Sequence, residues 1–379
     1  MNEERKRILV IGPLPPPYAG VEIMTDVLLR GLKHTGHFSI LHLNTHDPRG
    51  SANKGRLDFY NIYYAFMHFF QLAIILLRED PCIVYLPISQ NTLGFIRDSM
   101  LIILSAAFNK KVVVHLHGAY FHKFYRQSYW QLKVFIKYVF KYIRAGIVLG
   151  KDLKNIFNGL LPSNCVFVVN NGIPDVMKEY RDNKFLRIRR NRIKKQILFV
   201  GIMKKSKGYM DLLKAAPIIL NKRKDVKFVF AGEWYPDGGR EESYKFIEAH
   251  KIGKYVHFPG IITGYKKSDL YRNSDIFVFP SYFRFEGQPL VIIEAMAVGL
   301  PIITTPIGVI RDCVQEGVNG YFISHNNPNE VAEKTIKLLE QPVLMRKLGR
   351  NSRRIFVKHF TSSIFIKGME EVINIIGSD

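Results

Sequence analysis

The sequence predicts an α/β protein made of two doubly wound, Rossmann-like domains in tandem. Two observations support this fold class. Short runs of β-branched and other apolar residues alternate with helix-length segments along most of the 379 residues. Most of these runs also lack alternating polar residues, so we expect strands that are buried on both faces, as in parallel sheets covered by helices. Repeated strand–helix–strand units of this kind build doubly wound domains.

The predicted strands fall into two series of six. In the first half of the chain we expect strands at residues 8–11, 39–43, 83–86, 112–116, 147–149 and 166–169. In the second half we expect them at residues 197–200, 227–230, 256–258, 276–279, 302–304 and 321–323. Two series imply two sheets and therefore two domains.

A basic segment marks the expected domain boundary. Residues 181–195 contain eight basic residues and one acid without clear periodicity, which is typical of a solvated linker; a contact with an anion or a lipid is the alternative. We therefore predict domains at residues 1–180 and 181–359. Residues 364–376 carry apolar side chains at helical spacing and predict an amphipathic helix. The spacing leaves its partner open, and packing of residues 360–379 back on the first domain is one option.

The composition is strongly basic and excludes some classes of protein. With 47% hydrophobic residues the chain is not a disordered protein. The formal net charge of +23 indicates an anionic partner such as lipid headgroups, nucleic acid or a phosphorylated small molecule. Three widely spaced cysteines without a Cys-x-x-Cys pair argue against a disulfide scaffold or a zinc ribbon and fit a reduced compartment.

No secretion signal and no membrane-spanning helix are expected. The apolar run at residues 8–11 is too short for a signal peptide, and prolines follow it directly. The longest apolar runs, residues 72–77 and 100–108, fall short of the ~20 residues needed to cross a bilayer. We therefore expect a cytoplasmic protein, either soluble or peripheral at the inner face of the cell membrane.

The most informative stretch is residues 281–305, SYFRFEGQPLVIIEAMAVGLPIITT. We expect a helix over residues 290–298, with Pro289 in its first turn and Gly299 just past its end. Backbone N–H groups at such a helix start suit an anion, for example a diphosphate. Glu286 before the helix and Glu294 within it would contact opposite ends of one extended ligand; the alternative is that both are ordinary solvated acids.

This stretch resembles the signature of the retaining family 4 glycosyltransferases of the GT-B fold, also described as glycosyl transferases group 1. The resemblance rests on the acid-Gly-x-Pro start, on Glu-Ala-Met-Ala and on the closing Gly-x-Pro. Further family landmarks follow in the expected order, namely the loop at residues 15–22, His117-Gly118, Asn-Asn-Gly-Ile at 170–173, Lys207-Gly208, Ala-Gly-Glu at 231–233 and Gly-Val-Asn-Gly-Tyr at 317–321. Each is weak alone, but the series indicates the family.

The resemblance implies a nucleotide-sugar donor, with UDP favoured over GDP, and a role for each matching residue. Glu294 would accept hydrogen bonds from the two ribose hydroxyls, and Glu286 would contact the donor sugar near the reacting carbon. Lys207 would stabilise the charge that develops as the nucleotide leaves. The backbone that borders sugar and phosphate would come from Gly287, Gln288, Pro289 and Leu290.

Two further positions of the first domain match the family. His117 ends a predicted strand at the carboxyl edge, where doubly wound folds place ligands, and would face the transferred sugar; a purely structural histidine is the alternative. His115, two residues earlier, is expected to point to the opposite face of the sheet. Gly20 lies in the loop after the first strand and would allow close approach of backbone and ligand.

One position departs from the family. An arginine commonly follows the glycine after the strand at residues 197–200, and here the residue is Ile202. Lys204 or Lys205 are the candidates to replace it, although an ammonium does not reproduce the arginine fork. The sequence has no Asp-x-Asp pair and no metal-ligand spacing, so we expect no metal cofactor.

Residues 120–144 suggest where some of the positive charge is used. They include ten aromatic residues and no acid, and Lys133, Lys137, Lys141 and Arg144 would share one helical stripe. A basic helix flanked by aromatics can lie in a membrane interface; a helix packed on its own sheet is the alternative, and no nucleic-acid-binding motif accompanies the stripe.

Together these features predict a retaining glycosyltransferase acting on a lipid-linked or saccharide acceptor in bacterial cell-surface polysaccharide assembly. Lipopolysaccharide assembly is one such setting. Two alternatives remain, a nucleotide-sugar epimerase of the same fold and a non-catalytic membrane-associated binding protein.

Overall fold

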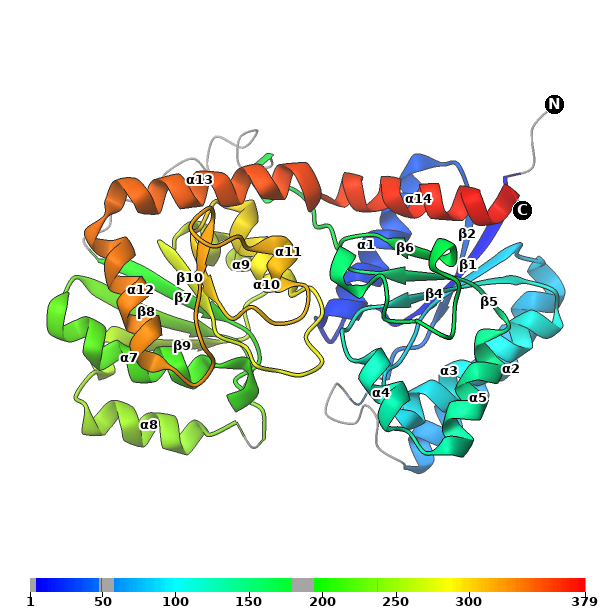
Figure 1. Ribbon diagram of the computed structural model, residues 1–379, viewed down its shortest axis with the longest axis horizontal. Coiled ribbons are helices and arrows are strands. Elements are labelled where there is room, and N and C mark those ends of the chain that lie inside the picture. Colours follow the sequence, from blue (N-terminus) through cyan, green and yellow to red (C-terminus); the bar gives the residue numbers. More distant parts are fainter. Residues whose placement is uncertain (1–4, 48, 50–57, 179–193, 237, 379) are drawn as a thin grey trace. The chain divides into compact units, whose positions relative to one another are not determined.

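The computed structural model describes residues 5–47, 49, 58–178, 194–236 and 238–378 (Figure 1). The chain forms two compact units. The first comprises Met1–Gly172 together with Ser362–Asp379, and the second comprises Ile173–Thr361. Apart from Lys194 and Lys195, the predicted basic linker lies outside the described residues.

The first unit is built on a six-stranded sheet with the order β2-β1-β3-β4-β5-β6. All of its strand pairs are parallel. The strands are β1 (Arg7–Gly12), β2 (Ser39–Asn44), β3 (Ile83–Pro87), β4 (Lys111–Leu116), β5 (Ile143–Val148) and β6 (Val166–Val168). The side chains of β1, β3, β4 and β5 are largely buried, as the absence of polar alternation predicted, whereas those of the edge strands β2 and β6 are mostly half-buried.

Helices cover both faces of this sheet because the strand order reverses after β2. With right-handed crossovers, the helix between β1 and β2 lies on one face, and the helices that connect the later strands lie on the other (Figure 1). The helices are α1 (Gly20–Thr35), α2 (Phe59–Glu79), α3 (Thr92–Ala107), α4 (Phe121–Gln127), α5 (Trp130–Phe140) and α14 (Ser362–Ser378). The predicted C-terminal helix is α14, and its apolar side chains pack against α1, where Ile366 adjoins Gly31.

The second unit repeats this architecture with the strand order β12-β11-β10-β7-β8-β9. Its strands are β7 (Lys195–Val200), β8 (Val226–Ala231), β9 (Val256–Gly260), β10 (Ile276–Phe279), β11 (Ile302–Thr304) and β12 (Gly320–Phe322). Its helices are α7 (Tyr209–Lys222), α8 (Arg240–Ala249), α9 (Gly264–Arg272), α10 (Leu290–Ala297), α11 (Ile310–Cys313), α12 (Pro328–Glu340) and α13 (Pro342–His359). α12 packs on α7, and α13 packs on α10 (Figure 1).

All twelve predicted strands are present, and the differences lie at the ends of elements. β5 begins at Ile143, four residues before the predicted start. α10 ends at Ala297, and Pro289 is its N-cap with extended backbone, not a residue of its first turn.

The prediction that Lys133, Lys137, Lys141 and Arg144 share one helical stripe was wrong. Ser128 and Tyr129 are both extended and separate α4 from α5. Arg144 lies on β5, and Lys141 caps α5. Within the predicted stripe, only Lys133 and Lys137 therefore share one helix.

The expectation that no segment is long and apolar enough to span a membrane was also wrong. α2 has 21 residues and a mean hydropathy of 1.4 over its most apolar window, of which 17% is buried. The apolar run at residues 72–77 is only the C-terminal part of this helix. Uncharged tyrosine, asparagine, histidine and glutamine residues extend that run towards the N-terminus without adding charge.

Candidate functional site

The loop between β10 and α10 is fixed by contacts to neighbouring segments. The amide N–H of Tyr282 donates to the carbonyl of Ser206 at 2.8 Å, and the Thr305 hydroxyl donates to the carbonyl of Ser281. Gly308 has a φ of +51°, and a Cβ there would lie 2.4 Å from the carbonyl oxygen of Glu286. Only glycine fits so close to this loop.

Glu286 and Lys207 form a mostly buried ion pair. Glu286 Oε2 accepts from Lys207 Nζ at 2.7 Å and from the Ser281 hydroxyl at 2.7 Å. The side chains of Lys207 and Glu286 are 18% and 10% exposed, so little water screens their interaction. The Phe283 ring lies 4.4 Å from Lys207 Nζ and covers the ammonium. The structure thus joins two predicted site residues that are 79 positions apart.

Gly208 allows Lys207 to reach this position. Gly208 has a φ of +77° and is the N-cap of α7. A Cβ at Gly208 would lie 2.0 Å from the carbonyl oxygen of Pro280, at the end of β10. The Lys-Gly pair therefore needs glycine for both its backbone conformation and its packing.

The two lysines proposed to replace the family arginine have different surroundings. Lys205 Nζ pairs with Glu242 of α8 at 2.6 Å, and this contact raises the pKa of Lys205. Lys204 Nζ lies 4.3 Å from the Tyr235 ring and 5.7 Å from the Phe283 ring. Lys204 thus shares an aromatic neighbour with Lys207, whereas Lys205 is held by α8.

Glu294 is held by two residues of α9 that the sequence analysis missed. Its Oε1 accepts from Lys267 Nζ at 2.6 Å, and its Oε2 accepts from the Tyr271 hydroxyl at 2.8 Å. Tyr271 is buried, and burial together with the Glu294 carboxylate raises the pKa of Tyr271 well above its usual range. The i, i+4 spacing of Lys267 and Tyr271 places both on one side of a helix. This spacing is the feature of the sequence that could have indicated a shared partner.

The segment that leads into α10 is buried. Gln288 and Leu290 are 4% and 8% exposed, and the intervening Pro289 contributes no side-chain cap to α10. Negative charge is stabilised near a helix N-terminus, and Glu286 lies just before this one. The predicted contact of this backbone with a diphosphate stays a prediction.

In the first unit, His117 follows the carboxyl end of β4 as expected, but His115 does not point away from it. The two ring centroids are 4.0 Å apart, because residues i and i+2 of a strand share one face. His115 Nδ1 is hydrogen-bonded to the Tyr85 hydroxyl at 2.8 Å. Burial lowers the pKa of His117 to about 4, so the ring is neutral at pH 7.

Gly20 is the first residue of α1. A Cβ at Gly20 would meet no protein atom within 4 Å, so the surrounding protein does not itself require glycine there. Among the residues that the structure describes, no three His, Cys, Asp or Glu side chains are grouped to hold a metal ion.

The sequence of the second unit identifies a known domain. Residues 181–355 match the family described as "Glycosyl transferases group 1", and this range includes the Glu286–Lys207 pair and Glu294. Residues 181–355 therefore resemble a group 1 glycosyltransferase domain. The predicted family is therefore confirmed at the level of group 1.

Curated relatives of the chain include a spore coat protein and a glycosyltransferase of capsular polysaccharide biosynthesis. The chain is 38% identical over 167 residues to Spore coat protein SA of Bacillus subtilis, covering 42% of this chain and 44% of the relative. It is 30% identical over 180 residues to the Capsular polysaccharide biosynthesis glycosyltransferase CapM of Staphylococcus aureus, covering 46% and 45%. The chain thus spans about half the length of these curated relatives.

A solved structure resembles nearly the whole chain. HepE of Anabaena, crystallised in complex with UDP, has a TM-score of 0.70 at 15% identity and covers 97% of this chain and 99% of its own. Together with the two parallel six-stranded sheets, this likeness confirms the expected GT-B fold class with two Rossmann-like units.

Proposed function

We propose that the protein is a retaining glycosyltransferase that moves a sugar from a nucleotide-sugar donor, UDP-linked in preference to GDP-linked, to a saccharide or lipid-linked acceptor. The observation that carries the proposal is the Lys207–Glu286 contact beside the start of α10, within a group 1 domain. In this contact the Lys207 ammonium lies within one hydrogen bond of the Glu286 carboxylate, which we propose binds the donor sugar.

The chemistry follows from these two charges. The departing nucleotide carries negative charge, which the Lys207 ammonium and the α10 N-terminus would stabilise. Glu286 would accept hydrogen bonds from the sugar hydroxyls, and Glu294 from the ribose. Because Ser281 and Phe283 already hold the Lys207–Glu286 pair, the site needs little rearrangement as charge develops. Retention of configuration and independence of a metal are part of the proposal. The first derives from the family resemblance, and the second from the sequence, which has no Asp-x-Asp pair and no metal-ligand spacing.

The setting is proposed from the relatives and from the charge. The spore-coat and capsule proteins support assembly of a cell-surface polysaccharide, and the UDP in HepE supports a UDP-linked donor. The net charge of +23 supports a peripheral position at the anionic inner face of the cell membrane.

A thermal-shift panel of UDP, GDP, ADP and their sugars, followed by turnover assays, tests this proposal. Specific ligands stabilise by RT ln(1 + [L]/Kd), so UDP and one UDP-sugar should raise Tm most. Label should then pass to an acceptor in a bacterial lipid or polysaccharide extract. Lys207→Met should abolish transfer, whereas the matched exposed lysine variant Lys222→Met, at the far end of α7, should retain it.

Three results would contradict the proposal. Interconversion of free nucleotide sugars without acceptor labelling would identify an epimerase. If the protein binds UDP but neither transfers the sugar nor slowly hydrolyses the donor, it is a binding protein. Equal transfer by wild type and Lys207→Met would show that the Lys207–Glu286 pair is not the reacting site.

A further inference from the structure

One side of α2 exposes a continuous row of large apolar side chains. Along this helix, eight large apolar residues are 45–77% exposed. They are Phe59, Tyr60, Ile62, Tyr63, Phe66, Phe70, Ile74 and Leu77. Most of them recur every three or four residues, so they share one face of the helix. We call this row the α2 face. In a water-soluble monomer this face would ordinarily be polar.

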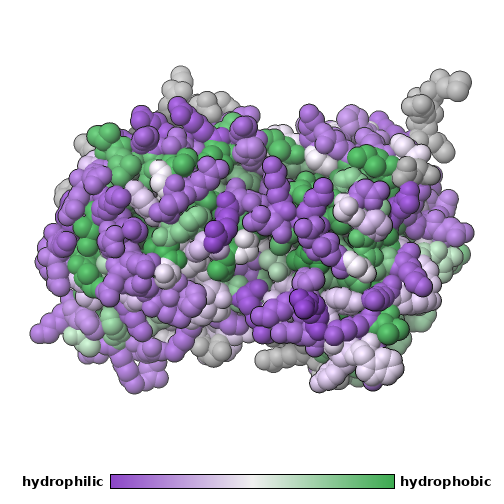
Figure 2. Space-filling model, viewed as in Figure 1, coloured by the Kyte–Doolittle hydropathy of each residue, from purple (hydrophilic) through white to green (hydrophobic). Residues whose placement is uncertain are grey.

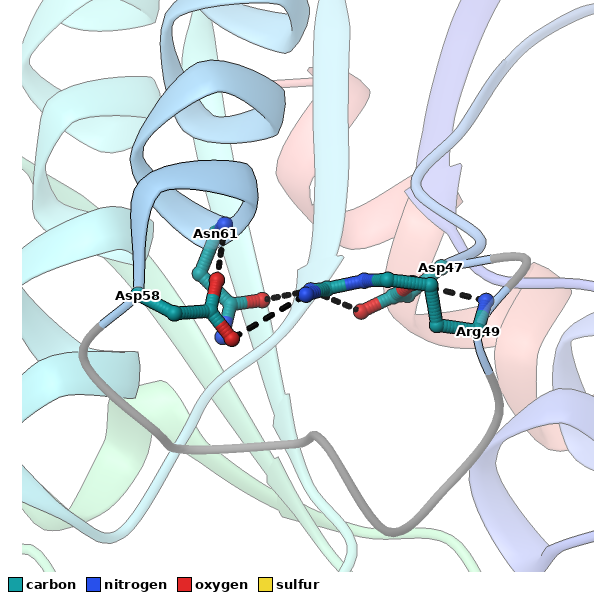
Figure 3. Close-up of polar contacts among 4 residues, drawn as sticks. All are labelled: Asp47, Arg49, Asp58 and Asn61. Atoms are coloured by element: carbon teal, nitrogen blue, oxygen red, sulfur yellow. Dashed lines mark hydrogen bonds and ion pairs between the residues drawn. The ribbon is translucent and has the colours of Figure 1, made fainter.

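The helix that carries the α2 face is well anchored. Asp58 is its N-cap and accepts from the Asn61 amide at 2.7 Å. Arg49 bridges Asp58 at 3.0 Å and Asp47 at 2.8 Å (Figure 3). On the opposite side of the helix, His68, Leu72 and Leu76 are buried. The exposed apolar residues therefore belong to a helix that is capped at its N-terminus and packed against the rest of the first unit.

Neighbouring helices extend the same surface. α3 packs against both α2 and α5, and the three lie together on one side of the sheet (Figure 1). Exposed apolar side chains continue on α3 and at α5, namely Leu93, Ile96, Tyr129, Trp130, Val134 and Tyr138. These three helices and the residue preceding α5 hold more than half of the exposed large apolar side chains among the described residues. At the lower right of Figure 2, where these helices lie, residues of hydrophobic (green) and intermediate (near-white) hydropathy reach the surface.

The charges around this surface are mostly positive. The acids of α2 to α5 are Glu79, at the far end of α2, and Asp98, which is buried and paired with Arg97 at 2.7 Å. The remaining basic residues of these helices are Arg78, Lys123, Arg126, Lys133 and Lys137. An apolar surface rich in tyrosine and tryptophan, with basic residues around it, suits a lipid–water interface that contains anionic headgroups.

The topology excludes a spanning role for α2 in this fold. α2 connects β2 to β3, and both strands pair with β1 in the same sheet. A bilayer crossing would place β2 and β3 on opposite sides of the membrane and break the sheet. α2 can therefore meet a bilayer only along its side.

We infer that the α2 face, with its extension on α3 and α5, lies in the headgroup region of a bilayer containing anionic lipid. The inference rests on the peripheral location in the proposed function and assigns that location a defined surface. This surface is centred on α2 and borders only Lys133 and Lys137 of the stripe expected from the sequence. Inserted aromatic side chains supply affinity, and the basic residues supply preference for anionic lipid. A second copy of the chain is a less suitable occupant, because two such faces would bring like charges together.

Vesicle sedimentation of the full chain tests the inference. Phe66→Gln with Phe70→Gln should weaken binding to phosphatidylcholine–phosphatidylglycerol vesicles about tenfold or more, because two buried aromatic contacts are lost. Ile364→Gln with Ile375→Gln is the matched control. These two exposed residues lie on α14 of the same unit, and their replacement should leave binding unchanged. Lys133→Gln with Lys137→Gln should reduce the dependence on phosphatidylglycerol, and added salt should do the same.

The inference is overturned if wild type fails to bind vesicles, or if both apolar double variants bind as wild type does. It is also overturned if wild type is a dimer that only the α2 variant dissociates and vesicle binding is unaffected. Circular dichroism and the UDP thermal shift check that the variants fold. Vesicle binding without a UDP shift would contradict the proposed transferase function while leaving the docking surface in place, so the two failures are distinguishable.

Discussion

Replacing Glu294 by alanine should abolish most of the nucleotide affinity, because we propose that the Glu294 carboxylate binds the ribose hydroxyls. Each carboxylate oxygen has two lone pairs. In the structure, one lone pair of Oε1 accepts from Lys267 and one of Oε2 accepts from Tyr271. The second lone pair of each oxygen suits one ribose hydroxyl, so α9 orients the carboxylate for two adjacent donors.

The magnitude follows from those two hydrogen bonds. A hydrogen bond to a charged group contributes about 1.5–3 kcal/mol. Two such bonds, taken near the lower value for a side chain that is 19% exposed, give about 3 kcal/mol, or roughly a hundredfold in Kd. Glu294→Ala also leaves the buried Tyr271 hydroxyl without its acceptor, which should lower the free energy of unfolding by about 1–3 kcal/mol.

Isothermal titration of UDP measures the effect, with thermal unfolding as the check that the variants remain folded. Tyr271→Phe is the control for the lost hydroxyl contact and should weaken UDP binding less, because the carboxylate stays. Glu286→Ala tests whether loss of any carboxylate at the site weakens UDP binding. UDP lacks the sugar that Glu286 would contact, so this variant should keep its UDP affinity and should turn over the UDP-sugar more slowly. Equal UDP affinity in wild type and folded Glu294→Ala would refute the ribose assignment.

Two further predictions concern metal and pH. Transfer should survive EDTA, because the Lys207 ammonium and the α10 N-terminus would stabilise the departing diphosphate; complete loss on chelation, reversed by manganese or magnesium, would contradict this. Burial lowers the pKa of His68 and of His117 from 6.5 to about 4. Between these two pH values the unfolded chain binds more protons than the folded chain. The free energy of unfolding therefore falls as the pH is lowered. Urea unfolding should show a loss on the order of 1 kcal/mol per ring between pH 7 and pH 5, and His117→Asn should reduce that loss; an unchanged pH dependence would show that His117 does not carry it.

The strands and their order in sequence were determined by the sequence itself. All twelve strands were predicted, most of them because a parallel strand buried on two faces must be apolar along its whole length. The helix after Glu286 could also be predicted from the sequence, because a proline precedes its start and Gly299 follows its end. Gly299 has a φ of +79°. Local chemistry of this kind depends on neighbours within a few residues.

Contacts between distant segments were decided only by the tertiary structure. Motifs selected Lys207, Glu286 and Glu294 as separate residues, but folding joined Lys207 to Glu286 and supplied Lys267 and Tyr271 to Glu294. Folding likewise paired Lys205 with Glu242. Such partners depend on how strands are ordered in the sheet, which spacing along the chain does not encode.

The exposed face of α2 shows that prediction of surfaces from the sequence has the same limit, because it also depends on contacts between distant segments. Periodicity indicates which residues share a side of a helix, and composition indicates how apolar that side is. Whether that side is covered depends on which elements pack against it. On α2 the side containing Leu72 is buried and the side containing Phe70 is not, although both side chains are apolar. The sequence therefore determined the strands, the family and most candidate site residues, whereas only the packing of the sheet and helices decided which charges meet and which apolar face stays exposed.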